Sequence, residues 1–227
     1  MNVQVPAHAE FVLEGYVNPH QRQEEGPLGE STGYYLTYHN PVAKIKVITH
    51  RRDPVYHALM PFSAENRTLL FVPQEIETAI WLRKEVPAVR QVYCPNFGVV
   101  YVQIAKQSKE DVAAVINALF PYSWSPYAKV LAVFDTDVDI TDEEEVVWAL
   151  GSRVRPDKDI KIKPGLPGFI VDPSTVDTGE TGELSQHITR TAKVAIDATK
   201  PLAELDMFEK ADVPPDVQLK IARMLGI

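Results

Sequence analysis

Two glutamates near the start of the chain have the residue type and spacing for proton transfer. Glu25 and Glu30 lie five residues apart in the segment 25–35, which reads EGPLGESTGYY. Because glycine permits unusual backbone angles and proline fixes one torsion, this segment is predicted to form an ordered turn. Paired carboxylates in an ordered site can act as acid and base, since each changes the pKa of the other. The residues alone leave open a surface turn whose glutamates only face water.

A second acidic motif does not support a metal site. The run from Asp135 to Asp139 (DTDVD) is similar to the start of a calcium-binding EF-hand loop. That loop requires glycine at its sixth position and glutamate at its twelfth, where this chain has Ile140 and Val146. Metal binding by these acids is therefore not predicted.

Other single residues that could do chemistry are interpreted as structural. His50, in the run THRR, is expected to be a hydrogen-bonded structural histidine, and Ser31 lacks the G-x-S-x-G context of a nucleophile. Cys94 precedes a proline and is interpreted as a small apolar residue. The chain contains no G-x-G-x-x-G, P-loop or H-E-x-x-H pattern, so no common nucleotide or zinc motif is indicated.

Composition indicates a globular protein of the cytoplasm. The 227 residues are 45% hydrophobic and 24% charged, and the formal net charge is −8. This charge gives no basic surface for nucleic acid or for an anionic membrane. The single cysteine excludes an intrachain disulfide, which fits a reducing compartment, and no apolar run is long enough to span a membrane.

The elements that must position the two glutamates divide the chain into two parts. Residues 1–60 are predicted to be β-rich, with a loop over residues 18–33, extended structure over 55–60 and strands over residues 10–17, 34–38 and 43–51. These strands are too few to close a sheet, so their edges are expected to pair with another surface.

Residues 61–227 show alternating strand and helix patterns. Helices are predicted over residues 74–84, 111–120 and 143–152, and strands over residues 89–93, 98–104 and 129–134. Residues 174–186 are predicted to be a mobile loop, and residues 215–225 a tail helix. The fold class is therefore α/β (α+β), with a partial β-rich segment followed by an α/β domain.

Six stretches in the same order resemble the UbiD family of reversible decarboxylases, which use prenylated flavin mononucleotide (prenylated FMN). They are AEFVLEGYV, EGPLGESTGYY, ITHR, VFDTDVDI, VVWAL and KVAIDATK, beginning at residues 9, 25, 48, 133, 146 and 193. The resemblance covers nearly the whole chain but only about the C-terminal half of a family member. It implies that residues 1–60 are the end of a split β-barrel flavin domain and that residues 61–227 form a C-terminal oligomerisation domain.

The resemblance also implies an activity and site residues. Family members decarboxylate α,β-unsaturated or aromatic acids, or run the reverse reaction, through an adduct with the prenylated flavin. By motif position, Glu30 matches the proton donor and Glu25 the other carboxylate of a Glu-Arg-Glu network. Phe169, in the run LPGF, matches a stretch near the substrate pocket. Leu28 stands where family members commonly have Phe or Tyr.

The remaining parts of the family's site lie upstream of the matching region. They are the arginine of the network, most of the flavin surface, and the ligands of a divalent ion (Mn or Mg) and of K⁺. Glu10 and Glu14 follow those ligands in family order, so this chain is expected to hold no metal. We expect a separately encoded N-terminal-half subunit as partner, in a hetero- and homo-oligomer that is inactive without it. The alternatives are a truncated piece of a longer enzyme and a non-catalytic scaffold or regulatory subunit.

Overall fold

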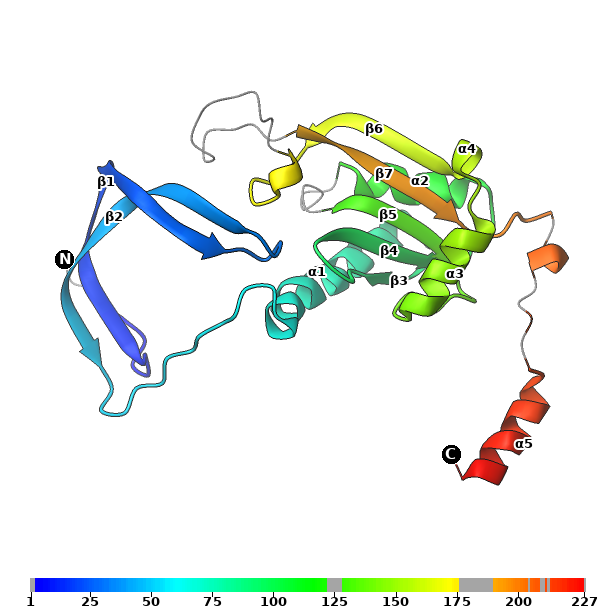
Figure 1. Ribbon diagram of the computed structural model, residues 1–227, viewed down its shortest axis with the longest axis horizontal. Helices are drawn as coiled ribbons and strands as arrows, with labels where there is room; N and C mark the ends of the chain where they lie inside the picture. Colours follow the sequence, from blue (N-terminus) through cyan, green and yellow to red (C-terminus); the bar gives the residue numbers. More distant parts are fainter. Residues whose placement is uncertain are drawn as a thin grey trace.

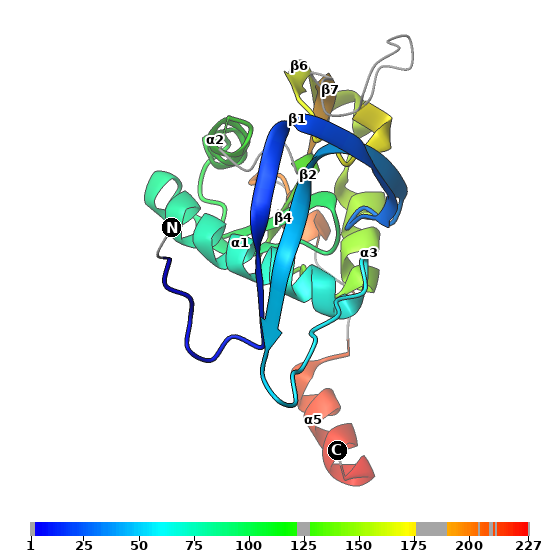
Figure 2. The ribbon, with the colours of Figure 1, turned by 90° about the vertical axis from the view of Figure 1, so that its left-hand side faces the viewer.

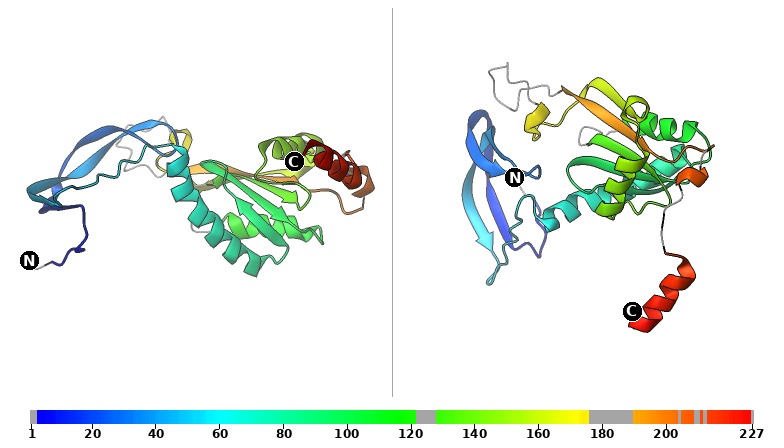
Figure 3. Two further views of the ribbon diagram at one scale, coloured as in Figure 1. Left: turned by 90° about the horizontal axis from the view of Figure 1, so that it is seen from below. Right: turned by 45° about the vertical axis from the view of Figure 1, so that its right-hand side comes forward.

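A computed structural model describes residues 3–121, 128–175, 190–203, 205–208, 211 and 213–226. These residues form a long β-hairpin and an α/β unit, joined by the segment 51–63 (Figure 1). The hairpin lies to one side of the α/β unit, and helix α5 (Pro215–Leu225) extends away at the other end (Figures 1 and 3). Strands and helices are mixed, so the predicted α/β class is confirmed.

The hairpin consists of β1 (Phe11–Gly29) and β2 (Tyr35–His50), which pair antiparallel. The predicted loop over residues 18–33 is wrong, because β1 continues to Gly29 and only residues 30–34 form the turn. Register shifts after Glu14, Asn18 and Glu25 show the reason: the glycines and prolines mark bulges that the ladder absorbs. The two strands predicted over residues 34–38 and 43–51 are parts of one strand, Tyr35–His50, and residues 55–60 form no strand.

The hairpin leaves large apolar side chains uncovered on both of its faces. Figure 2 shows its two strands side by side in front of the α/β unit. Because side chains alternate between faces along a strand, Tyr16 and Val17 point to opposite sides, yet they are 50% and 58% exposed. A two-stranded hairpin is at best marginally stable in water. The structure therefore presents a strand pair suited to packing against a further surface.

The α/β unit is built on a five-stranded sheet of order β3-β4-β5-β7-β6. Its strands are β3 (Val89–Tyr93), β4 (Gly98–Ile104), β5 (Ala128–Asp135), β6 (Ile160–Pro167) and β7 (Arg190–Ala198). Strands β4, β5 and β7 run parallel, and β3 and β6 pair antiparallel at the two edges. The strands predicted over residues 89–93, 98–104 and 129–134 are confirmed, whereas β6 and β7 were not predicted as strands.

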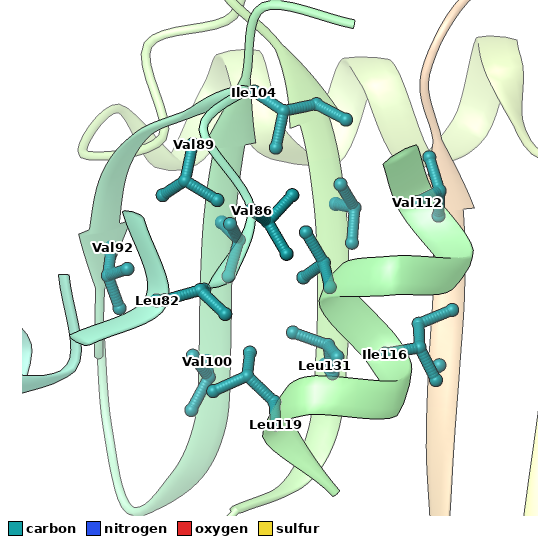
Figure 4. Packing of buried hydrophobic residues seen from close by; sticks show 14 of the residues in the cluster. Leu82, Val86, Val89, Val92, Val100, Ile104, Val112, Ile116, Leu119 and Leu131 are labelled. Carbon is teal, nitrogen blue, oxygen red and sulfur yellow. The ribbon is translucent and has the colours of Figure 1, made fainter. Parts of the chain in front are cut away.

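Helices cover both faces of this sheet. Helices α1 (Ala64–Glu85) and α2 (Glu110–Leu119) pack on one face, where alternate β4 residues such as Val100 and Val102 are buried against them (Figure 4). Helix α3 (Glu143–Arg153) packs on the other face, against Ala132 and Phe134 of β5. The short elements are α4 (Pro156–Asp159), η2 (Pro173–Thr175) and η4 (Leu205–Phe208).

The spacing of apolar residues predicted three helices correctly and a fourth that is too short. The structure confirms the helices predicted over residues 111–120, 143–152 and 215–225. The helix predicted over residues 74–84 starts ten residues earlier, at Ala64, because the Ser63 hydroxyl caps it by accepting from the Asn66 N–H at 3.0 Å and Pro73 is tolerated inside it. Of the predicted loop 174–186, residues 176–186 lie outside the described residues. No helix in the described part of the chain combines the length and the hydropathy needed to cross a membrane.

Lys193 carries a buried charge without a hydrogen-bond partner among the described residues. This side chain of β7 is 1% exposed, and its Nζ donates to none of them. Burial lowers the pKa of Lys193 to about 8, because desolvation disfavours the ammonium. At neutral pH the folded state therefore carries the cost of an unpaired buried cation.

We predict that Lys193→Met stabilises the chain by up to about 3 kcal/mol near neutral pH, since a shift of about two pKa units is removed. The folded pKa lies below the unfolded value of about 10.4, so the unfolded state binds more protons between the two values. Wild-type stability should therefore gain a contribution as pH rises through about 8, and the variant should lack it. Urea unfolding of the wild type and of Lys193→Met near neutral pH and above a pH of about 8 checks this prediction. The control is Lys161→Met, which removes an exposed lysine of β6. Loss of stability in Lys193→Met at neutral pH would contradict it.

Candidate active site

The hairpin turn is closed by the backbone of Glu30. The Glu30 N–H donates to the Tyr34 carbonyl at 2.9 Å, and the Glu30 carbonyl accepts from the Gly33 N–H at 2.9 Å. Gly33 has φ +87°, a left-handed conformation that glycine adopts without strain. Glu30 therefore sits at the base of a fixed turn rather than on a loose loop.

A tyrosine of β2 lies between the two candidate carboxylates. The Tyr38 hydroxyl donates to Glu30 Oε1 at 2.5 Å, and Tyr38 is also the direct cross-strand partner of Glu25. Glu25 Oε2 accepts from Asn40 Nδ2 at 2.5 Å. Burial, then the hydrogen bond to Glu30, raises the pKa of Tyr38, so its hydroxyl stays a donor. The sequence reasoning missed Tyr38 and Asn40, although their spacing along one strand places both on the same face.

A bulge near the end of β1 separates Glu25, on the strand, from Glu30, in the turn that follows it. The register shifts between Glu25 and Leu28, where Gly26 has φ +134°. A Cβ at Gly26 would lie 2.9 Å from the Leu36 carbonyl oxygen, so glycine is required there. Leu28, the departure from the family pattern, is 41% exposed.

The hairpin tip contacts the α/β unit and the segment that precedes α1. The Thr32 hydroxyl donates to the Val171 carbonyl at 3.0 Å. On the other side, a Cβ at Gly33 would lie 3.5 Å from the ring of Phe62, two residues before α1, so the turn packs closely against that segment. Glu30 is thus held between the start of α1 and the turn that precedes η2.

Phe169 lies in that same turn. Its ring is tilted against Phe97 with 5.5 Å between centroids, and its carbonyl accepts from Thr175 Oγ1 at 3.0 Å. Because Phe169 is two residues from Val171 and Glu30 two residues from Thr32, the contact between Thr32 and Val171 brings the two candidate site residues to the same region.

A cavity of about 230 Å³ lies at the start of α1, between that helix and the residues after β3. Its lining includes Arg67, Phe71, Glu75 and Cys94. The guanidinium of Arg67 lies 5.6 Å from the ring centroid of Phe62, which packs on the hairpin tip. Arg67, which lines the cavity, is therefore linked through Phe62 to the turn that carries Glu30.

The lining of the cavity includes one cation, Arg67, and one half-buried acid, Glu75. Arg67 makes no ion pair with any residue that the structure describes. Glu75 accepts from the Cys94 N–H at 2.8 Å, and burial raises the pKa of this carboxyl. Burial and the Glu75 charge raise the pKa of Cys94 to about 12, so it is a thiol and no nucleophile. Arg67 and Glu75 were missed, because helical spacing alone gave no reason to single them out.

The acids that follow β5 are structural. Asp137 accepts from Arg153 Nη2 at 2.8 Å and from Lys200 Nζ at 2.9 Å, and these hydrogen bonds hold its pKa low although burial opposes them. Asp139 bonds the Thr141 hydroxyl at 2.7 Å. Across the described ranges, no three His, Cys, Asp or Glu side chains are grouped so that they could hold a metal ion.

Glu10 and His50 also have local partners. Glu10 accepts from Arg51 Nη1 at 2.9 Å and from the Val55 N–H at 3.0 Å, which lowers its pKa. His50 Nδ1 lies 2.6 Å from the Arg51 carbonyl oxygen, in line with a structural histidine. These contacts fix where the chain leaves the hairpin.

Comparison with known proteins places this geometry in a family. Residues 67–198 match the model of the 3-octaprenyl-4-hydroxybenzoate carboxy-lyase C-terminal domain, and residues 1–64 match that of its Rift-related domain. Anhydromevalonate phosphate decarboxylase of Methanosarcina mazei is 36% identical over 94% of this chain and 49% of its own length. The enzyme of the same name from Methanothermobacter thermautotrophicus is 34% identical over 92% of this chain.

Solved structures give the same result. The UbiD-class enzyme HmfF from Pelotomaculum thermopropionicum, in complex with FMN, is 32% identical with a TM-score of 0.80 and matches 96% of this chain. Vanillic acid decarboxylase of Sedimentibacter hydroxybenzoicus is 29% identical with a TM-score of 0.73. This chain spans 48% of each of those chains, as it spans about half of the curated relatives. Both domain models and both solved structures confirm the resemblance seen in the sequence: the chain belongs to the UbiD family.

Proposed function

We propose that this chain supplies the proton-transfer carboxylates of a prenylated-FMN-dependent decarboxylase or carboxylase that acts on an α,β-unsaturated or aromatic carboxylic acid. The observation that carries this proposal is the position of Glu30, which Tyr38 holds at a fixed turn that packs on Phe62, the ring that Arg67 of the cavity also contacts. Relatives named as decarboxylases, and HmfF structures with FMN and with prenylated FMN, support the reaction class and the cofactor.

Glu30 is proposed as the proton donor. Loss of carbon dioxide leaves the substrate carbon in need of one proton, which the protonated Glu30 carboxyl can deliver. The Tyr38 hydroxyl fixes Glu30 Oε1 and stabilises the carboxylate that remains. Glu25, held by Asn40 on the same strand pair, is proposed as the second carboxylate of the network. In the carboxylation direction Glu30 would accept the proton instead.

The chain fits the cofactor only in part. When bound, prenylated FMN supplies the electron sink for the breaking carbon–carbon bond. The described residues offer acids and an uncovered apolar hairpin, but no side-chain group that could hold the cofactor's metal ion. We therefore assign the network arginine, the ligands for Mn or Mg and for K⁺, and most of the flavin surface to a separately encoded N-terminal half. The strands of the hairpin would pair with or pack on that half.

The cavity at the start of α1 is proposed to hold the substrate acid. Its volume of about 230 Å³ suits a small molecule rather than a drug-sized one. Arg67 can pair with the substrate carboxylate, because its guanidinium presents two parallel donors. Phe71, which also lines the cavity, would supply an apolar and aromatic contact to the unsaturated part. Phe169 packs on Phe97 outside this lining and is proposed to contact the substrate from the turn beside Thr32.

We predict that Glu30→Gln lowers kcat of the enzyme reconstituted with an N-terminal half at least about 100-fold, because the amide cannot deliver a proton. Assembly, followed by native mass, should be unchanged. The matched control is Glu24→Gln, which removes an exposed glutamate from the same strand. Turnover of Glu30→Gln near wild type would sink the assignment, and turnover by the chain alone would contradict the need for the other half.

Tyr38→Phe should lower kcat about 10-fold with little change in KM, because a hydrogen bond to a charged group is worth about 1.5–3 kcal/mol. Steady-state kinetics of this variant measures the loss, and Tyr34→Phe, in the exposed turn, serves as the control. A kcat of Tyr38→Phe equal to that of Tyr34→Phe would show that the hydrogen bond to Glu30 has only a structural role.

Arg67→Gln should raise KM for the acid at least about 10-fold while kcat changes less, because it removes ground-state binding of the carboxylate. Lys84→Gln, in the last turn of the same helix, removes one positive charge without touching the cavity. Steady-state kinetics of both variants, with KM and kcat compared between them, tests this prediction. Equal effects of the two changes would mean that only net charge matters.

A further inference from the structure

A second cavity lies at the end of the sheet away from the hairpin. Strands β4, β5 and β7 are parallel, so their carboxyl ends meet at one edge. A cavity of about 600 Å³ lies beyond this edge, between the residues that follow β4 and β7, the end of α3 and the tail around η4. Figures 1 and 3 show these elements on the side of the α/β unit opposite the hairpin. In open α/β sheets, ligands bind preferentially outside the carboxyl ends of the strands.

The lining of this cavity is strongly basic. Five basic residues face two acidic ones; they are Lys106, Lys109, Arg153, Arg155 and Lys158 against Asp159 and Asp197. Both acidic side chains already accept hydrogen bonds from backbone N–H groups of this chain. Asp197 accepts from the Thr199 N–H at 3.0 Å, and Asp159 accepts from the Arg155 N–H at 2.7 Å.

Arg153 is not available to bind an anionic ligand, because its side chain already has partners within the chain. Its guanidinium is bound to Asp137 and lies over the Trp148 ring, 4.8 Å from the centroid. Arg155 pairs with Asp157 at 3.0 Å in an exposed contact, which is weak and can be exchanged. The cations available to a ligand are therefore the three lysines and, at the rim, Arg155.

Lys106 is pre-positioned at the floor of the cavity. Its Nζ donates to the Thr199 hydroxyl at 2.6 Å and to the Lys200 carbonyl at 3.1 Å, and both acceptors are uncharged. An ammonium has three donors, so one N–H has no partner among the residues that the structure describes. Lys106 is half-buried and makes no ion-pair contact with those residues, although its charge also acts on Asp111 and Asp135 from a distance. Its third N–H therefore remains available to an anion in the cavity.

We propose that this crevice binds a small organic phosphate, with its phosphate groups on Lys106, Lys109 and Lys158. Val154, Leu202 and Phe208 form an apolar wall that suits a ring or hydrocarbon portion. The cavity volume is within the range for small-molecule sites. The site is separate from the candidate active site, and its ligand would act as an effector or a second substrate.

Calorimetric titration of the chain with pyrophosphate, ATP and inorganic phosphate tests this proposal. We expect pyrophosphate and ATP to bind, ATP at least about 10-fold more tightly because only it offers a part for the apolar wall. Affinity should fall steeply with added salt, as for any site built on lysines. Binding of pyrophosphate and ATP with equal affinity would overturn the organic part of the proposal, and binding of neither would overturn all of it.

Two variants locate the site. Lys106→Gln and Lys158→Gln should each weaken ATP at least about 10-fold, whereas Lys44→Gln on the hairpin removes the same charge and should leave affinity unchanged. Lys106 also tethers the segment after β7, so its thermal unfolding must be compared with wild type. Lys158 has no such structural role and keeps the test valid if Lys106→Gln unfolds. Equal losses in Lys158→Gln and Lys44→Gln would show non-specific charge attraction and overturn the proposal.

Discussion

The register between β1 and β2 is the constraint on which the candidate site depends. It sets Tyr38 opposite Glu25, and the bulge after Glu25 lets the Tyr38 hydroxyl reach Glu30. A slip of one residue would turn every side chain of one strand to the other face. Gly26 makes this bulge possible, because any Cβ there would meet the Leu36 carbonyl. The positions of both carboxylates thus follow from one strand pairing.

The same hairpin is incomplete as a structure. It is a two-stranded sheet with large apolar side chains exposed on both faces, and it is joined to the α/β unit mainly through its tip. The α/β unit, by contrast, has cores on both faces of its sheet. A chain of this kind can fold its C-terminal part independently while presenting its acids on an arm. This division agrees with the proposal that another half of the enzyme covers the arm and supplies the flavin.

Local patterns predicted the elements whose signal is contained in a short stretch. The spacing of Val112, Val115, Ile116 and Leu119 identified α2, and all four are buried as a helix face requires. Glycine and proline misled the prediction for residues 18–33, because in a long hairpin they mark bulges as well as turns. Residue type, spacing and motif resemblance singled out Glu25 and Glu30 as candidates, which they remain. Tyr38 was missed because its contact with Glu30 depends on pairing with another strand. Arg67 was missed for a similar reason: only the fold brings the start of α1 beside the hairpin tip.

This chain is proposed to provide acids to a flavin that an N-terminal half holds. Native mass spectrometry and an absorbance spectrum of the assembly purified from the source cells test this proposal most directly. We expect an assembly that contains N-terminal-half UbiD sequence beside this chain, together with a flavin spectrum. A colourless assembly made of this chain alone would contradict it, and would favour a scaffold role for the fold.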